Sequence, residues 1–203
     1  MAYVANTAFE IKVSNHEFDS IANITGKYQS SATDAETCPG FLCVRASRTV
    51  NDGYNAVGPA GSTVTLYNTN TWIMNDATDA TTAQQGIYAC NPFDVNMASD
   101  GQGNFWKVGA NTLSIKVPAG HLTTWTKIEF NNNNVYRFGV GNLSTTLSTN
   151  TYFTIDDGKL VPGASAPASA GVPYFTLVGK GTFTEGAYAA FDYVDVMACI
   201  SEA

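Results

Sequence analysis

Residues 126–140 read TKIEFNNNNVYRFGV. Two short segments that contain apolar residues flank four consecutive asparagines. In the first segment Thr126, Ile128 and Phe130 alternate with charged residues, which is the period-two pattern of a strand with one buried face. The asparagines at 131–134 accept positive φ angles and close Asx-type turns. The stretch therefore predicts a strand, a tight turn and a second strand over 135–140.

The same alternation recurs along the chain, while a period of 3.6 residues is rare. Clear examples are Phe9, Ile11 and Val13 near the amino terminus and Leu113 to Val117 in the middle. Turn residues follow many of the runs, as at 51–53, 99–101 and 156–158. We also expect strands at 41–50, 63–67, 72–74, 86–90, 152–155, 174–178 and 188–200. Many short strands with regular turns predict an all-β protein, an antiparallel sandwich or barrel with long loops.

One short helix is expected near the amino terminus. Ser14 and Glu17 have the spacing of a capping box, apolar residues follow at helical spacing to Ala22, and Gly26 is expected to end the run. Together with the strand before it, this helix would form an N-terminal arm over 1–35, which packs either on its own domain or on a neighbour.

The rest of the chain, residues 36–203, is predicted to be one β-rich domain, with a subdivision near 140–150 as an alternative. The Pro- and Ala-rich stretch at 162–173 is expected to be an exposed loop rather than a linker. Few strands follow it, too few for a separate stable domain.

The chain is poor in charge. Only 13% of its 203 residues are charged, against about 25% in an ordinary protein. Residues 53–75, 138–155 and 160–179 carry no charge at all. Much of the surface must then be uncharged hydroxyl, amide and backbone, which can be brought against a neighbour without leaving an ion unpaired. This composition favours a protein that works in close contact with other subunits.

Several partner classes are disfavoured by the same composition. The net charge is −7 and no cluster of basic residues is present, so direct nucleic-acid binding is not expected. No run approaches the ~20 apolar residues of a membrane helix, and the Met1 to Asn6 start lacks the features of a secretory signal. We therefore expect a soluble protein that is synthesised in the cytosol and does not bind a membrane.

The four cysteines are predicted to be buried thiols, since three of them lie in apolar, strand-like contexts. A disulfide or metal site is the alternative, and His16 and His121 would have to complete such a site. The residues are Cys38, Cys43, Cys90 and Cys199. Asp94, Asn96 and Asp100 superficially suggest a calcium loop, but their spacing fails the EF-hand pattern. No cofactor is expected.

Catalytic motifs are not found. The sequence has no nucleophile elbow, phosphate-binding glycine loop or His-Glu-x-x-His helix. A carboxylate pair assembled from distant segments remains an open alternative, which would make the protein a hydrolase. A second alternative is a lectin-like module that binds carbohydrate on aromatic side chains. Its candidate residues are Trp72, Trp106, Trp125, Tyr67, Tyr88 and Phe105.

The last third of the chain resembles a known group of viral proteins. The residues that carry the resemblance are the Met-Ala start, the turn at 156–163 (DDGKLVPG), and the closing segments 178–183 (VGKGTF) and 191–196 (FDYVDV). These features are similar to those of the decoration, or cement, proteins of tailed-bacteriophage capsids. The resemblance implies a non-enzymatic virion protein that binds the capsid exterior, bridges neighbouring capsid subunits and forms an oligomer. A tail-tube protein or another virion subunit would share these features.

The expected partners are the major capsid protein and further copies of the chain. Contact residues are sought first in the N-terminal arm, because chain termini become ordered only when something holds them. Tyr3, Val4, Phe9 and Ile11 are the predicted contact groups. The expected location is the virion surface, after synthesis in the host cytoplasm.

Overall fold

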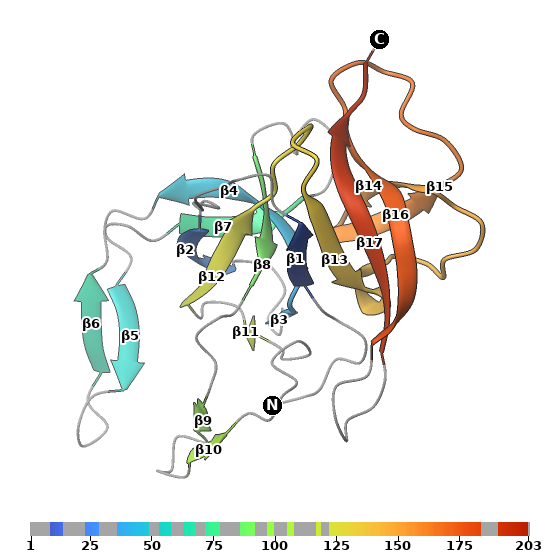
Figure 1. The fold of residues 1–203 in the computed structure, drawn as a ribbon. Helices are drawn as coiled ribbons and strands as arrows, with labels where there is room; N and C mark the ends of the chain where they lie inside the picture. Colours follow the sequence, from blue (N-terminus) through green and yellow to red (C-terminus); the bar gives the residue numbers. More distant parts are fainter. Residues whose placement is uncertain are drawn as a thin grey trace.

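The computed structural model describes residues 9–13, 23–28, 36–48, 53–57, 63–67, 72–77, 86–91, 97–99, 105–107, 117–118, 122–183 and 191–202 (Figure 1). Within these ranges the protein is all-β, which confirms the predicted fold class. The one helical element of the described part is a single 3₁₀ turn, Val140–Asn142.

Five strands close into a barrel, in the order β12-β2-β7-β4-β8. Neighbouring strands run antiparallel, except that β2 and β7 are parallel. A short pair, β3 with β11, belongs to the same half of the molecule. The bounds are β2 Asn23–Tyr28, β3 Glu36–Thr37, β4 Leu42–Arg48, β7 Trp72–Asp76, β8 Ile87–Cys90, β11 Val117–Pro118 and β12 Leu122–Lys127.

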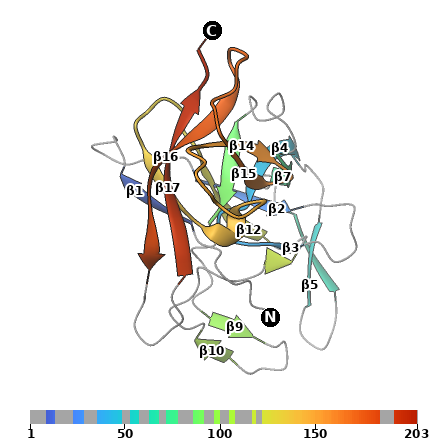
Figure 2. The same cartoon turned by 90° about the vertical axis from the view of Figure 1, so that its right-hand side faces the viewer.

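Six strands form an open antiparallel sheet beside the barrel, in the order β1-β13-β17-β16-β14-β15 (Figures 1 and 2). Two further hairpins, β5–β6 and β9–β10, pair separately. The sheet strands are β1 Phe9–Val13, β13 Val135–Gly139, β14 Tyr152–Asp156, β15 Lys159–Gly163, β16 Pro173–Phe183 and β17 Phe191–Ile200. The hairpin strands are β5 Gly53–Val57, β6 Thr63–Tyr67, β9 Met97–Ser99 and β10 Phe105–Lys107.

Strand β8 separates two hydrophobic cores, since all four of its residues are buried. Ile87 and Ala89 face the six-stranded sheet and belong to the larger core. Tyr88 and Cys90 face the barrel interior and belong to the smaller core with Trp125. Because successive side chains of a strand point to opposite faces, one buried strand can serve both cores. The barrel therefore has a packed interior and a packed outer wall.

The stretch 126–140 carries the chain from the barrel into the sheet. Strand β12 ends at Lys127, and β13 begins at Val135 in the other sheet. Asn131 and Asn133 have φ angles of 56° and 55°, as the four asparagines predict. The hydroxyl of Tyr136 accepts a hydrogen bond of 2.9 Å from the backbone N–H of Glu129, which holds the two ends of the crossing together.

The N-terminal arm contributes strands to both halves of the molecule. Strand β1 pairs with β13 in the open sheet, and β2 lies between β12 and β7 in the barrel. The helix expected after Ser14 falls on residues 14–22, outside the described part. Gly26 does not end a helix but lies inside β2. An added Cβ there would lie 2.8 Å from Met74 and 3.0 Å from Trp125, so the packed barrel interior requires a glycine.

The loop after β15 is confirmed as an exposed connection within the sheet, over residues 164–172. Pro162 and Gly163, expected in the loop, belong instead to β15, where they pair with Phe153 and Tyr152. Ser201 fastens the far end of the loop. Its hydroxyl donates to the carbonyl of Ser169 at 2.5 Å and accepts from the backbone N–H of Val172 at 2.9 Å. Strands on both sides of residues 140–150 also belong to this one sheet.

All four cysteines are free thiols. Cys43 and Cys90 are fully buried in the barrel, as predicted, whereas Cys38 and Cys199 are half-buried. Burial raises the pKa of both buried thiols well above the ordinary value, because a thiolate would be poorly solvated there. These two side chains therefore act as small apolar core residues.

Candidate functional site

One mouth of the barrel carries two basic side chains among aromatic rings. Lys127 lies directly opposite Tyr88 in the pairing of β12 with β8, so both side chains are on the barrel-interior face. Arg45 lies opposite Met74 and shares that face. The guanidinium carbon of Arg45 is 4.7 Å from the ring centre of Trp72 and 5.4 Å from that of Tyr88. The two rings hold this cation by cation–π contacts.

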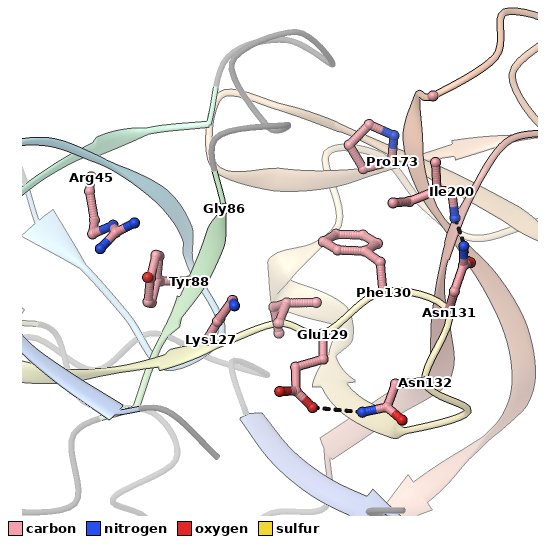
Figure 3. A pocket seen from close by; sticks show the side chains of 12 residues that line it. Arg45, Gly86, Tyr88, Lys127, Glu129, Phe130, Asn131, Asn132, Pro173 and Ile200 are labelled. Carbon is pink, nitrogen blue, oxygen red and sulfur yellow. Dashed lines mark hydrogen bonds between the residues drawn. The ribbon is translucent and has the colours of Figure 1, made fainter. Parts of the chain in front are cut away.

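A cavity of about 610 Å³ opens at this mouth and extends to the end of the open sheet (Figure 3). Its lining includes the crossing segment 128–132 and, from the side of the open sheet, Gly171, Pro173 and Ile200. Figure 3 shows Arg45, Tyr88 and Lys127 on one side and Phe130 with Asn131 on the other. We call this cavity the mouth cavity.

The mouth cavity has more positive than negative side chains. Arg45 and Lys127 supply two cations and Glu129 supplies one carboxylate. That carboxylate is already engaged, because its Oε2 accepts hydrogen bonds from the side-chain amides of Asn132 at 2.8 Å and Asn134 at 3.2 Å. Within the described ranges, no carboxylate forms an ion pair with either cation. The cavity is thus able to accept a negatively charged group.

The outer side of the six-stranded sheet is a second candidate site. The barrel covers one side of the sheet, and no described strand packs on the other (Figures 1 and 2). Phe153 and Phe175 point to the barrel side and are fully buried, whereas their neighbours on the outer side are only half-buried. We call this outer side the open face. Its half-buried members include Val135, Tyr152, Thr154, Val161, Tyr174, Thr176, Met197 and Cys199.

The central charged residues of the open face, Arg137 and Asp195, neutralise each other. Arg137 and Asp195 lie opposite each other on β13 and β17 and form a two-pronged ion pair, with N···O distances of 2.7 and 2.8 Å. The ring of Tyr193 covers the guanidinium at 3.6 Å. Asp156 and Lys159 lie opposite each other at the β14–β15 turn, at the margin of the face. Most of the open face is therefore hydroxyl, aromatic and aliphatic.

A cavity of about 750 Å³ adjoins the β16–β17 hairpin. Hydroxyl side chains at 144–146 line one wall, and Lys180, Thr182 and Asp192 line the other. The hydroxyl of Thr182 donates to the carboxylate of Asp192 at 2.7 Å. This cavity repeats the mainly neutral, hydroxyl-rich character of the open face.

Asp76, at the end of β7, carries a perturbed carboxyl group. Burial raises its pKa, a hydrogen bond with Tyr28 partly offsets this, and the charge of Asp157 adds to the increase. Its Oδ1 atom is buried and has no hydrogen-bond partner among the described residues. Asp76 lines neither cavity described above. When it is ionised, the Asp76 carboxylate is therefore partly desolvated, and its charge destabilises the folded state.

Replacing Asp76 by asparagine is expected to raise the free energy of unfolding at pH 7, by up to about 1 kcal/mol because the group is partly solvated. The carboxyl has a higher pKa in the folded than in the unfolded chain, so the parent loses stability as the pH rises from about 4 through the folded value. The gain in Asp76→Asn should therefore vanish near pH 4. Urea unfolding at several pH values measures it, with the exposed Asp156→Asn as control. A gain that stayed constant with pH would contradict this assignment.

Of the four predicted contact residues, only Phe9 has a side chain that the structure describes. Phe9 is 3% exposed, and its ring packs against Tyr136 and Phe138 in the larger core. The structure therefore corrects its proposed role as a contact residue, because its apolar ring is already covered by its own chain. Ile11 lies in β1 opposite Tyr136, while Tyr3 and Val4 lie outside the described residues.

The aromatic residues proposed to bind sugar do not lie together: Trp125 is in the barrel core, whereas Trp72 and Tyr88 are at the barrel mouth. Trp125 is fully buried and donates its Nε1–H to the carbonyl of Gly26 at 3.2 Å, so it cannot form a platform. Trp72 and Tyr88 come together at the barrel mouth, around Arg45. The side chains of Tyr67, Phe105 and Trp106 are outside the described part. So are His16, His121, Asp94, Asn96 and Asp100.

Sequence reasoning missed Arg45 and Lys127. Alternation along 126–130 marks Lys127 as lying on the opposite side from Ile128, which suggests solvent. In the structure Ile128 faces the larger core and Lys127 faces the barrel mouth. The available signal was the presence of two cations in strands of an acidic, charge-poor chain, but only strand pairing brings them together.

No helix in the described ranges has the length and apolarity needed to cross a membrane. Among the residues that the structure describes, no group of three or more potential metal ligands (His, Cys, Asp or Glu) lies close enough together to hold a metal ion. No known family, curated protein or solved structure matches this chain.

Proposed function

We propose that this protein is a non-enzymatic structural protein of a virus particle, a decoration or cement protein on the outside of a tailed-bacteriophage capsid. In this role it contacts the major capsid protein and copies of itself through the open face, and it works as a homo-oligomer. The observation that carries the proposal is the half-buried, nearly charge-free open face. A tail-tube protein or another virion subunit is the alternative within the same class.

The chemistry of the open face suits a contact surface. Cores of protein interfaces are depleted in charge and enriched in aromatic residues and methionine. Tyr152 and Tyr174, with ring centres 6.1 Å apart, and Met197 supply such groups. The Arg137–Asp195 pair is already formed within the chain, so covering it would not leave an unpaired ion.

Exposed loops that connect strands of the same sheet are also free of charge. Residues 144–146, 148, 149 and 151 are exposed serines and threonines, and residues 164, 165 and 168–170 are exposed alanines and serines. Small, uncharged side chains allow the backbones of two subunits to approach closely. Many modest contacts of this kind, repeated over a shell, would stabilise a particle by multivalent engagement.

The proposal is tested by locating the protein in purified particles from the source of the sequence. We expect the chain to sediment with particles in a fixed ratio to the major capsid subunit, and electron microscopy to show it as density on the outside of the shell. Absence from the particles would contradict the proposal. If the chain is absent from the particles, saturable binding in a glycan screen would favour the lectin alternative, and turnover lost on changing one carboxylate would favour the hydrolase alternative.

Changing Thr154 to lysine is expected to weaken particle binding by at least about tenfold, because a neighbour would have to bury an unpaired ammonium group. Thr154 is half-buried on the open face, opposite Val161. The isolated chain should remain folded, since the lysine is then solvated. Co-sedimentation of purified chain with particles lacking it measures the effect.

The matched control for this variant is Asn75→Lys. Asn75 is exposed on β7 of the barrel, away from the open face, and the substitution adds the same charge to a strand. Equal weakening by both variants would show that net charge, rather than the open face, controls binding. Unchanged binding of Thr154→Lys would remove the open face from the contact.

A further inference from the structure

The barrel mouth holds an arginine, Arg45, whose guanidinium makes no hydrogen bond to any residue that the structure describes. The guanidinium carbon of Arg45 lies over the rings of Trp72 and Tyr88, at 4.7 and 5.4 Å from their centres. A cation–π contact satisfies none of the guanidinium's N–H donors, and the fork of these donors matches the geometry of a carboxylate. The Arg45 side chain makes no hydrogen bond or ion pair with any described residue. The rings of Trp72 and Tyr88 therefore hold the Arg45 side chain in place, while no described carboxylate neutralises its charge.

Lys127 places a second cation on the same cavity. It is half-buried, lines the mouth cavity beside Tyr88, and has no ion pair within the described ranges. The one carboxylate of the cavity, Glu129, is bound by two asparagine amides. A chain with ten basic residues and a net charge of −7 has thus placed two cations on one cavity, and no described carboxylate forms an ion pair with either. A ligand with a negative group would complete the site.

The opposite side of the mouth cavity is suited to the uncharged body of such a ligand. The Oδ1 atom of Asn131 accepts a hydrogen bond of 2.9 Å from the backbone N–H of Ile200, which fixes the amide and leaves its NH₂ group without a described partner. The Phe130 ring lies next to it. An amide donor beside an aromatic ring can contact the hydroxyl groups and the apolar face of a sugar. The cavity volume of about 610 Å³ lies within the usual range for small-molecule sites.

We propose that the mouth cavity binds an acidic monosaccharide, a sugar ring that carries a carboxylate. The carboxylate is bound by Arg45 and Lys127, and the ring lies between Phe130 and the amide of Asn131. This site is separate from the open face, and it requires neither an assembled particle nor a second copy of the chain.

The test is titration of the full chain with glucuronate, followed by calorimetry or by NMR chemical-shift changes. Glucose has the same ring without the carboxylate, and acetate has the carboxylate without the ring. We expect glucuronate to bind saturably and at least about tenfold more tightly than either, because both halves of the cavity then contribute. No saturable binding of glucuronate, or equal binding of glucose or of acetate, would overturn the proposal.

Two variants locate the binding. Arg45→Gln and Lys127→Gln are each expected to weaken glucuronate binding by about 10- to 100-fold, the value of one charge-assisted contact. The Lys127 side chain makes no ion pair or hydrogen bond with another described residue, so its variant remains informative even if loss of Arg45 disturbs the barrel. Lys180→Gln, which removes the same charge from the other cavity, is the control. Unchanged affinity in Lys127→Gln, or equal loss in Lys180→Gln, would refute this location.

Discussion

Replacing Gly158 by alanine is expected to lower the free energy of unfolding by about 2–4 kcal/mol. Gly158 ends the β14–β15 turn with a φ angle of +70°, a conformation that L side chains rarely adopt. An added Cβ would also overlap the ring of Phe41, which packs edge-on against Tyr28 at 5.6 Å in the barrel core. The backbone strain and the overlap act in the same direction.

Relief of that overlap is costly because Gly158 also links the two halves of the molecule. Its carbonyl accepts from the backbone N–H of Leu42 at 2.8 Å, and its own N–H donates to the carbonyl of Ala77 at 3.0 Å. Moving the turn away from Phe41 would stretch both hydrogen bonds. Urea unfolding measures the loss, and Gly163→Ala is the control, since its Cβ would meet nothing closer than 3.7 Å. A change below about 0.5 kcal/mol in Gly158→Ala would contradict this account.

Replacing Phe175 by alanine is expected to cost about 3–5 kcal/mol of stability, the usual range for a fully buried phenylalanine. Phe175 lies on β16 and points into the core between the sheet and the barrel. Its ring centre is 6.0 Å from that of Phe138 and 5.8 Å from that of Phe130. The substitution would leave a cavity between three elements that cannot easily close around it.

Tyr174→Ala is the matched control. Tyr174 directly precedes Phe175 on β16, and its side chain points to the open face instead of the core. Tyr174 is only half-buried, so its truncation should cost less than half as much as that of Phe175 in the same urea unfolding measurement. Equal costs would mean that the outer side of the sheet is covered in the isolated chain. That outcome would also remove the observation on which the proposed particle role rests.

Local sequence patterns predicted many individual strands and turns. Thr63–Tyr67 is a strand with the bounds expected from the sequence, and the turn at 156–158 is confirmed with Asp157 and Gly158 at positive φ angles. Such elements depend on alternation and on residues that tolerate unusual backbone angles, and both are properties of a few neighbouring residues. The reasoning failed at Gly26, where the tertiary contact with Met74 and Trp125 determines the residue.

The candidate sites were less predictable than the strands. The absence of charge over 138–155 and 160–179 was visible, but its concentration around one side of a sheet depends on which strands pair. Phe9 was interpreted as a contact residue because it lies near a terminus, yet β1 pairs with β13, and its ring enters the core. Arg45 and Lys127 are separated by most of the barrel sequence and meet only when it closes.

The sequence by itself determined that the chain is built from strands, where several of them turn, and that its surface is poor in charge. These properties follow from side-chain polarity, strand periodicity and backbone preference, which act over a few residues. Only the tertiary structure decided which strands form the barrel and which form the open sheet, because alternation shows that a strand has two faces but not what covers each. Long-range pairing therefore created the mouth cavity and the open face, the two surfaces to which we assign function.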